Sequence, residues 1–240
     1  YAGLAGESAP GRPVMSGLYR MGVGENQWQL LSNGLPDGAA IRAITVHPQR
    51  PETVIIGTQF GPYRTNDHGE HWEKLNVPDH GLPVWSILFH PRTSDVVYAG
   101  YEGAEIYRSD DGGDHWREVS GNLTSDFGFP IEVHAHEPET VYVVPIKSDS
   151  EHFPPDGKLR VYRSRTGGDE WEPLTNGLPQ RDCYVNVLRD AMAVDSLDPC
   201  GIYFGTTGGQ VYVSADGGDS WSPIVHDLPR VVSVEVQTLA

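Results

Sequence analysis

The chain has 240 residues and a formal net charge of −16, with 17 Lys and Arg against 33 Asp and Glu. This charge repels nucleic acid and anionic membranes, so we expect neither as a partner. Its 28 glycines and 19 prolines fall between short apolar runs, which is typical of an all-β protein with many turns. A chain of this length can form one domain, and we expect a single domain over residues 1–240.

The predicted elements are short strands throughout. Residues 1–31 predict three strands, at Tyr1–Ala5, Gly17–Arg20 and Trp28–Leu31. Four segments then repeat one order of strands: an alternating inner strand, a Val/Tyr-rich second, a Tyr-Arg third and a Trp-led outer strand. The inner strands are expected at Ile41–His47, Val84–His90, Ile131–His136 and Val187–Asp195. The chain finishes in one more alternating segment, Val231–Ala240.

An eight-residue phrase recurs between the third and outer strands of the repeated segments. Its copies are Thr65–Trp72, Ser109–Trp116, Ser164–Trp171 and Ser214–Trp221, with a degenerate copy at Met21–Trp28. The closing tryptophans follow one another at intervals of 44, 44, 55 and 50 residues. A period of about 40–50 residues with strand-like runs between is typical of propeller blades.

The phrase Ser/Thr-x-Asp-x-Gly-x-x-Trp is the Asp-box, so the chain resembles the BNR/Asp-box repeat family, which includes sialidases, sortilin-type receptors and photosystem assembly factors. The resemblance implies a β-propeller in which each box forms a tight turn between the outer two strands, away from the ligand face. The boxes are therefore expected to be architectural. The third copy carries Thr166 in place of Asp, so we expect that turn to be less well tied.

We predict an all-β, five-bladed β-propeller with four antiparallel strands per blade; six blades are the alternative. Residues 1–31 lack an inner strand, and Val231–Ala240 lacks a blade to follow it. Pairing these two segments completes one blade from both ends of the chain. Such closure leaves no open sheet edge.

Three residues are the candidate site. The inner strands alternate, so one parity packs into the blades and the other lines the central channel. Most channel-facing residues are small, and the exceptions are Glu132, His134 and Glu235. Two carboxylates and an imidazole suit a divalent cation such as Mn²⁺, Zn²⁺ or Ca²⁺. The alternative is a buried His–Glu hydrogen-bonded pair with ordered water.

A second set of residues, His47, His90, His136 and Asp195, occurs at matching positions of four blades. We expect these residues to end the inner strands and to hydrogen-bond the following turn. Further candidates lie on the loop face: Arg42, Gln59, Tyr101, Glu102, Asp126, Arg181, Asp182, Tyr184, Asp190 and Arg230. The insertion Lys147–Lys158 contains Asp149, Glu151 and His152, which could cover the channel mouth.

Three functions fit these features. The first is a binding scaffold whose polar channel holds a small ligand, a divalent metal or a partner protein. The second is a metal-dependent enzyme, hydrolytic or peroxidase-like, with Glu132, His134 and Glu235 as catalytic residues and metal ligands. The third is a glycoside hydrolase using the two carboxylates. Sialidase activity is disfavoured because the chain contains no Arg-Ile-Pro segment. The sequence leaves open whether the protein is an enzyme.

The two cysteines, Cys183 and Cys200, flank a long predicted inner strand, too far apart for a disulfide. Unpaired thiols favour a reducing compartment, so a cytoplasmic location is expected, although a removed leader peptide stays open. We expect a monomer.

Overall fold

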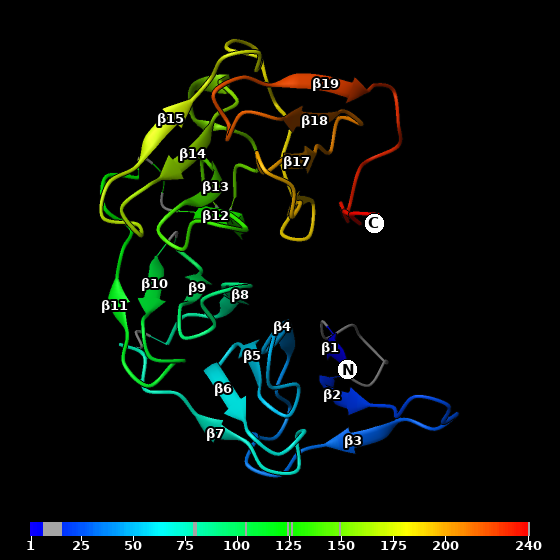
Figure 1. Ribbon diagram of the computed structural model, residues 1–240. Helices are drawn as coiled ribbons and strands as arrows, with labels where there is room; N and C mark the ends of the chain where they lie inside the picture. Colours follow the sequence, from blue (N-terminus) through cyan, green and yellow to red (C-terminus); the bar gives the residue numbers. More distant parts are fainter. Residues whose placement is uncertain are drawn as a thin grey trace.

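The computed structural model describes residues 1–6, 16–78, 81–103, 105–123, 125, 127–148 and 150–239. The fold is all-β, with five antiparallel sheets arranged as propeller blades in an arc around a central opening (Figure 1). The described residues contain no helix long and apolar enough to cross a membrane.

Each sheet is a meander in which consecutive strands pair. The first sheet has three strands, β1 (Ala2–Ala5), β2 (Ser16–Arg20) and β3 (Gln29–Leu31). The second contains β4 (Ile41–Val46), β5 (Val54–Thr58), β6 (Gly61–Thr65) and β7 (Glu73–Lys74). The third contains β8 (Val84–Phe89), β9 (Val97–Tyr101), β10 (Ile106–Ser109) and β11 (Arg117–Glu118). The fourth contains β12 (Phe127–Val133), β13 (Val141–Ile146), β14 (Val161–Ser164) and β15 (Glu172–Leu174), with a short 3₁₀ turn, η1 (Pro155–Gly157), between β13 and β14. The fifth contains β16 (Met192–Val194), β17 (Ile202–Gly205), β18 (Val211–Ser214) and β19 (Ser222–Val225).

The apolar core is distributed over the junctions between blades rather than gathered in one place. Among the described residues it forms four clusters, each shared by two neighbouring sheets. The cluster between the first two sheets, for example, joins Leu18 and Leu31 to Ile41, Val54 and Trp72. Each blade therefore depends on its neighbours for burial of its apolar faces.

The Asp-boxes form the predicted tight turns. In the second sheet, the Asp67 carboxylate accepts the backbone N–H of His71 at 2.9 Å, and Thr65 Oγ1 accepts the N–H of Gly69 at 2.9 Å. Hydrogen bonds of the same kind lower the pKa of Asp111 to about 2. Thr166 replaces the carboxylate with its hydroxyl, which accepts the Glu170 N–H at 2.9 Å. The third turn thus keeps this backbone bond without the charge.

Two of the boxes dock closely, by matching contacts, onto the blade before them. The N–H of Trp72 donates to the carbonyl of Asn33 at 3.0 Å, and the N–H of Trp221 donates to that of Asn176 at 3.0 Å. A Cβ added to Gly177 would lie 1.9 Å from the Trp221 carbonyl oxygen. Only glycine permits this approach, and Gly177 also has a positive φ of 86°.

Arginines on the strands that precede the boxes reinforce these junctions. Arg20 reaches Glu70 of the next box at 2.7 Å, Arg64 reaches Asp114 at 2.7 Å and Arg163 reaches Asp219 at 2.8 Å. Arg108 binds Glu139 of the next blade instead. The last blade carries Val213 at this position, so the series of arginines ends there.

The C-terminal segment lies where the inner strand of a following blade would begin. A Cβ on Gly205 would meet Val231, as one on Gly57 would meet Val84 of the next inner strand. The N–H of Val234 donates to the Asp190 carbonyl at 2.8 Å. This placement agrees with the predicted position of residues 231–240 beside the last blade, but residues 231–239 form no strand; Ala240 is outside the described residues.

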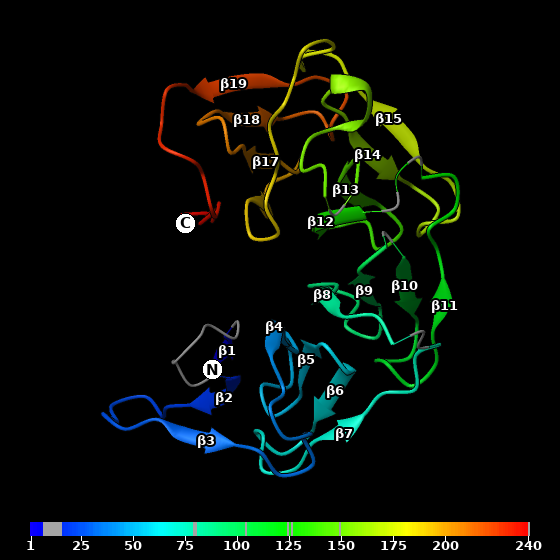
Figure 2. The same cartoon turned by 180° about the vertical axis from the view of Figure 1, so that it is seen from behind.

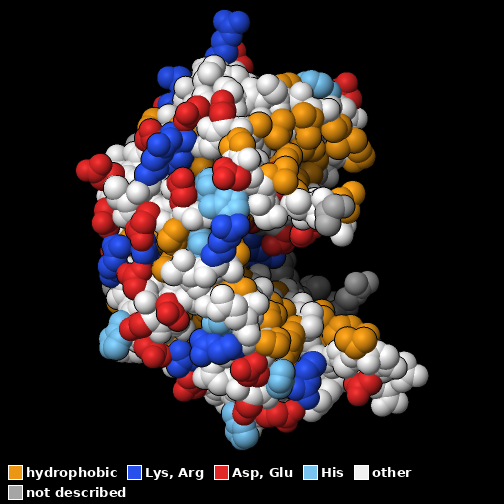
Figure 3. All heavy atoms as spheres, in the orientation of Figure 1, with side chains coloured by type: hydrophobic (Ala, Val, Ile, Leu, Met, Phe, Trp, Pro, Cys, Tyr) orange, Lys and Arg blue, Asp and Glu red, His pale blue; other side chains and the backbone are white. Residues whose placement is uncertain are grey.

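Closure of the ring differs from the prediction. Within the described ranges β1 pairs only with β2, and residues 231–239 form no strand ladder. Both views show the C-terminal segment and the first sheet standing apart, on either side of an opening (Figures 1 and 2), and the space-filling view shows a hollow on the same side (Figure 3). The segment lacks the neighbouring backbone that a ladder needs. At the first sheet Trp28 is 53% exposed, whereas Trp221 at the last sheet is 3% exposed.

We predict that Gly177→Ala destabilises the fold far more than Gly38→Ala. Both glycines have positive φ, but a Cβ on Gly38 meets nothing within 4 Å. Gly38→Ala should cost about 1 kcal/mol from backbone strain alone, and Gly177→Ala about 3 kcal/mol or more because the next box must shift. Urea unfolding measures both; equal losses would contradict the close-docked junction.

Candidate functional site

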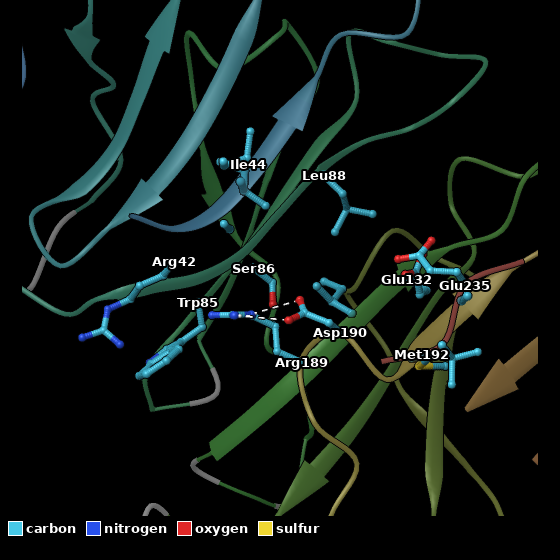
Figure 4. Close-up of a pocket in the computed structure, with 15 residues that line it drawn as sticks. Arg42, Ile44, Trp85, Ser86, Leu88, Glu132, Arg189, Asp190, Met192 and Glu235 are labelled. Atoms are coloured by element: carbon cyan, nitrogen blue, oxygen red, sulfur yellow. Dashed lines mark hydrogen bonds and ion pairs between the residues drawn. The ribbon is translucent and has the colours of Figure 1, made fainter. Parts of the chain in front are cut away.

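A cavity of about 220 Å³ opens between the inner strands near the centre of the arc (Figure 4). Strands β4, β8, β12 and β16, the turn before β16 and the C-terminal segment contribute to its lining. Arg42, Trp85 and Arg189 gather at one end, and Glu132 lies beside Glu235 at the other. The cavity therefore has a cationic and aromatic end and an acidic end.

Local irregularities in two strands create the cationic end. The pairing register shifts between Ile41 and Ala43 in β4 and between Val84 and Ser86 in β8. A bulge changes the direction of the side chain of its extra residue, which is Arg42 in β4 and Trp85 in β8. Simple alternation assigns Trp85 to the blade core, and that assignment is wrong for this reason. Alternation offered no signal for either bulge.

The side chains at this end stack on one another. The Arg42 guanidinium lies 4.0 Å from the centre of the Trp85 ring, and that of Arg189 lies 6.0 Å from it. Arg189 also pairs with the exposed carboxylate of Asp190 at 3.2 Å. Stacked arginine and tryptophan side chains form a preorganised surface for an anionic or aromatic group of a ligand.

The acidic end brings together two of the three predicted site residues. Glu132 projects from β12 into the cavity, and Glu235 reaches the same cavity from the C-terminal segment. Burial, followed by the negative charge of Glu235, raises the pKa of Glu132 to about 8. Glu132 therefore holds its proton at neutral pH in the absence of a cation.

His134 does not join them. Its Nδ1 accepts the backbone N–H of His136 at 3.2 Å, its own N–H donates to Thr140 at 2.9 Å, and it lines no cavity described for this chain. Strand β12 ends at Val133, not at the predicted His136, because this turn begins there. The expected three-residue cluster is thus reduced to a pair of carboxylates.

The turn role predicted for the second histidine set holds, with one change of residue. His47 Nδ1 accepts the N–H of Arg50 at 3.0 Å, and His90 Nδ1 accepts that of Thr93 at 2.8 Å. In the fourth blade the equivalent residue is His134 rather than His136. The spacing between each of these residues and its backbone hydrogen-bond partner identifies the equivalent position. Each such residue donates its N–H to the residue six positions on, as Asp195 does to Gly201.

The other candidates divide between the cavity and the surface. Asp190 lines the cavity with Arg42, whereas Asp126 and Asp149 lie outside the described residues. In the insertion, Phe153 packs edge-to-face on Tyr184 with ring centres 5.3 Å apart. Among the residues that the structure describes, no cluster of three or more His, Cys, Asp or Glu side chains could hold a metal ion. Both cysteines are buried and free.

Comparison with known proteins identifies related chains. Residues 61–189, more than half of the chain, match the Sortilin-Vps10 family model, described as Sortilin, neurotensin receptor 3. The vacuolar protein sorting/targeting protein 10 of Neurospora crassa is 29% identical over 135 residues, covering 53% of this chain and 8% of the relative. The protein of the same name from Sordaria macrospora is 26% identical over 167 residues, covering 66% of this chain and 10% of the relative. The chain thus spans about a tenth of these curated relatives or less.

Solved structures share the fold at low identity. An ancestral GH74 enzyme superimposes with a TM-score of 0.60 at 19% identity, covering 75% of this chain and 23% of the other. YCF48 from Cyanidioschyzon merolae superimposes with a TM-score of 0.57 at 17% identity, covering 83% of this chain and 60% of the other. These similarities concern the propeller architecture alone.

We predict that Glu132→Gln stabilises the protein increasingly as pH rises. Unfolded, Glu132 loses its proton near pH 4.5, whereas folded it retains the proton up to about pH 8. The free energy of unfolding of the wild type therefore falls as pH rises through this window, whereas that of the variant has no such decrease. We expect the advantage of the variant to grow by about 1–2 kcal/mol between pH 5 and 8.5, after allowance for solvent in the cavity. Urea unfolding across pH measures it; a pH-independent difference would contradict the burial of this carboxyl.

Proposed function

The chain belongs to the Sortilin-Vps10 family, and we propose that it is a binding scaffold that holds a segment of a partner protein at its central cavity. The observation that carries this proposal is the stacked Arg42–Trp85–Arg189 group at the cavity mouth. Tryptophan and arginine dominate the energetics of protein recognition because they bury large areas and form directional contacts.

The rest of the fold supports a binding role. The side chains of the group come from β4, β8 and the turn before β16, whose blades pack into shared apolar clusters. A rigid scaffold that presents side chains at strand ends is a common basis for recognition. The fungal relatives are named for the sorting and targeting of vacuolar proteins, which favours a protein over a small metabolite as the bound partner.

The alternative is a divalent cation, Mn²⁺, Zn²⁺ or Ca²⁺, at Glu132 and Glu235, with metal-dependent hydrolysis or redox chemistry. The residues present fit it poorly. Catalytic zinc sites use three protein ligands and calcium sites six or more oxygens, whereas the described site offers two carboxylates. Stoichiometric metal in the dialysed protein that is lost in Glu132→Gln, measured by plasma mass spectrometry, would favour this alternative. A glycosidase role would use the same carboxylates, and the likeness to GH74 enzymes is one of fold alone.

We predict that Trp85→Ala weakens partner binding by about tenfold or more, since the variant removes the ring on which Arg42 stacks. Peptide arrays covering acidic, basic and aromatic sequences select a ligand, and fluorescence anisotropy measures its affinity. Trp28→Ala is the matched control, because Trp28 is 53% exposed and does not line the central cavity. Peptide binding that both variants weaken equally, or no peptide binding by the wild type, would contradict the proposed site.

A further inference from the structure

We propose that the carboxylates of Glu132 and Glu235 bind a primary ammonium group on an alkyl stem, the group that a lysine side chain carries. The proposal rests on the function proposed above and assigns the chemistry of the bound segment at the acidic end of the cavity.

Glu132 is a partly buried carboxyl with no donor of its own. It projects into the cavity, where burial and the charge of Glu235 raise its pKa. Across the described part of the chain, no side chain or backbone N–H donates to it. A ligand that supplies a charged donor would form a charge-assisted hydrogen bond that this carboxyl lacks in the free protein.

The remaining walls fit an alkyl stem. Ile44, Leu88, Met192 and Val234 line the same cavity, and their side chains offer aliphatic surface. At about 220 Å³ the cavity is far larger than a bare metal ion requires. An ammonium on a flexible stem would pack its methylene groups on these walls while its head reaches the carboxylates, as lysine side chains do elsewhere.

The arginines do not occupy the acidic end. Figure 4 shows Arg42 and Arg189 on the far side of Ser86 and Asp190 from the Glu132–Glu235 pair. Neither arginine contributes to the pKa shift of Glu132. Asp190, paired with Arg189, offsets part of the positive charge between the two ends. The cavity is therefore bipolar, and a cation is drawn to one end of it.

An ammonium fits better than a metal. It has three N–H donors and needs no fixed coordination number, so two carboxylates and the solvent of the cavity satisfy it. A divalent metal needs further protein ligands, and the described ranges supply no third one. Lysine is also better suited than arginine, whose planar fork prefers a single carboxylate in a bidentate contact.

Isothermal titration calorimetry of the full chain with n-pentylammonium and Nα-acetyl-lysine methylamide tests the proposal. We expect one site per chain, at least tenfold weaker binding by Glu132→Gln and by Glu235→Gln, and no measurable binding of n-pentanol, which has the stem without the charge. Glu170→Gln is the matched control, since Glu170 is exposed near an outer-strand turn and should leave the affinity unchanged.

Several results would overturn the proposal. They are the absence of amine binding, equal binding of pentanol, retained affinity in both cavity variants, or saturable MnCl₂ binding at Glu132 without any amine binding. The proposed function is judged separately. Trp85-dependent peptide binding without amine binding removes the ammonium inference alone, whereas loss of peptide binding with amine binding intact removes the partner-protein role.

Discussion

The close docking of Asp-boxes such as Thr65–Trp72 and Ser214–Trp221 on the blade before them is the constraint on which the rest of the structure depends. The backbone N–H of Trp221 donates to the backbone carbonyl of Asn176 in the linker before its blade. Gly177, which has no Cβ, leaves room for the backbone carbonyl of Trp221. Because the apolar core is divided among the junctions, this contact sets the angle between blades and seals each part of the core. The angle between blades in turn positions the inner strands and the cavity that these strands line.

Both ends of the arc lack the residues that build an internal junction. Glu25 stands at the box position held elsewhere by Gly69, where a Cβ would lie 2.7 Å from the preceding Leu31 side chain. Asp227, at φ 61°, stands at the linker position of Gly177.

Much of this architecture could be predicted from the sequence. The recurrence of the box and its tryptophan predicts the number of sheets, and strand starts such as Ile41 and Val84 are correct because alternation and turn residues coincide there. The position of Val231 beside the last blade followed from its alternating pattern. What could not be predicted was whether the ends meet, since that depends on the summed angles of all the junctions rather than on any local pattern.

The site was predictable in part, for a related reason. Glu132 and Glu235 were found because they break an otherwise small-residue channel face. His134 begins the turn, because its backbone N–H donates to the Thr140 carbonyl six residues on, and alternation along the strand does not reveal where the strand ends. Arg42 and Trp85 reach the cavity through bulges, which alter side-chain direction without a signature in alternation.

Hydrogen–deuterium exchange with and without a selected peptide tests the central claim most directly, because it locates the bound segment on the fold. The account predicts slowed exchange at residues 41–46, 84–89, 187–192 and 231–237, around the cavity, and no change at the outer Asp-boxes. Protection confined to the boxes or to the outer strands would contradict the assignment of the central cavity as the binding site.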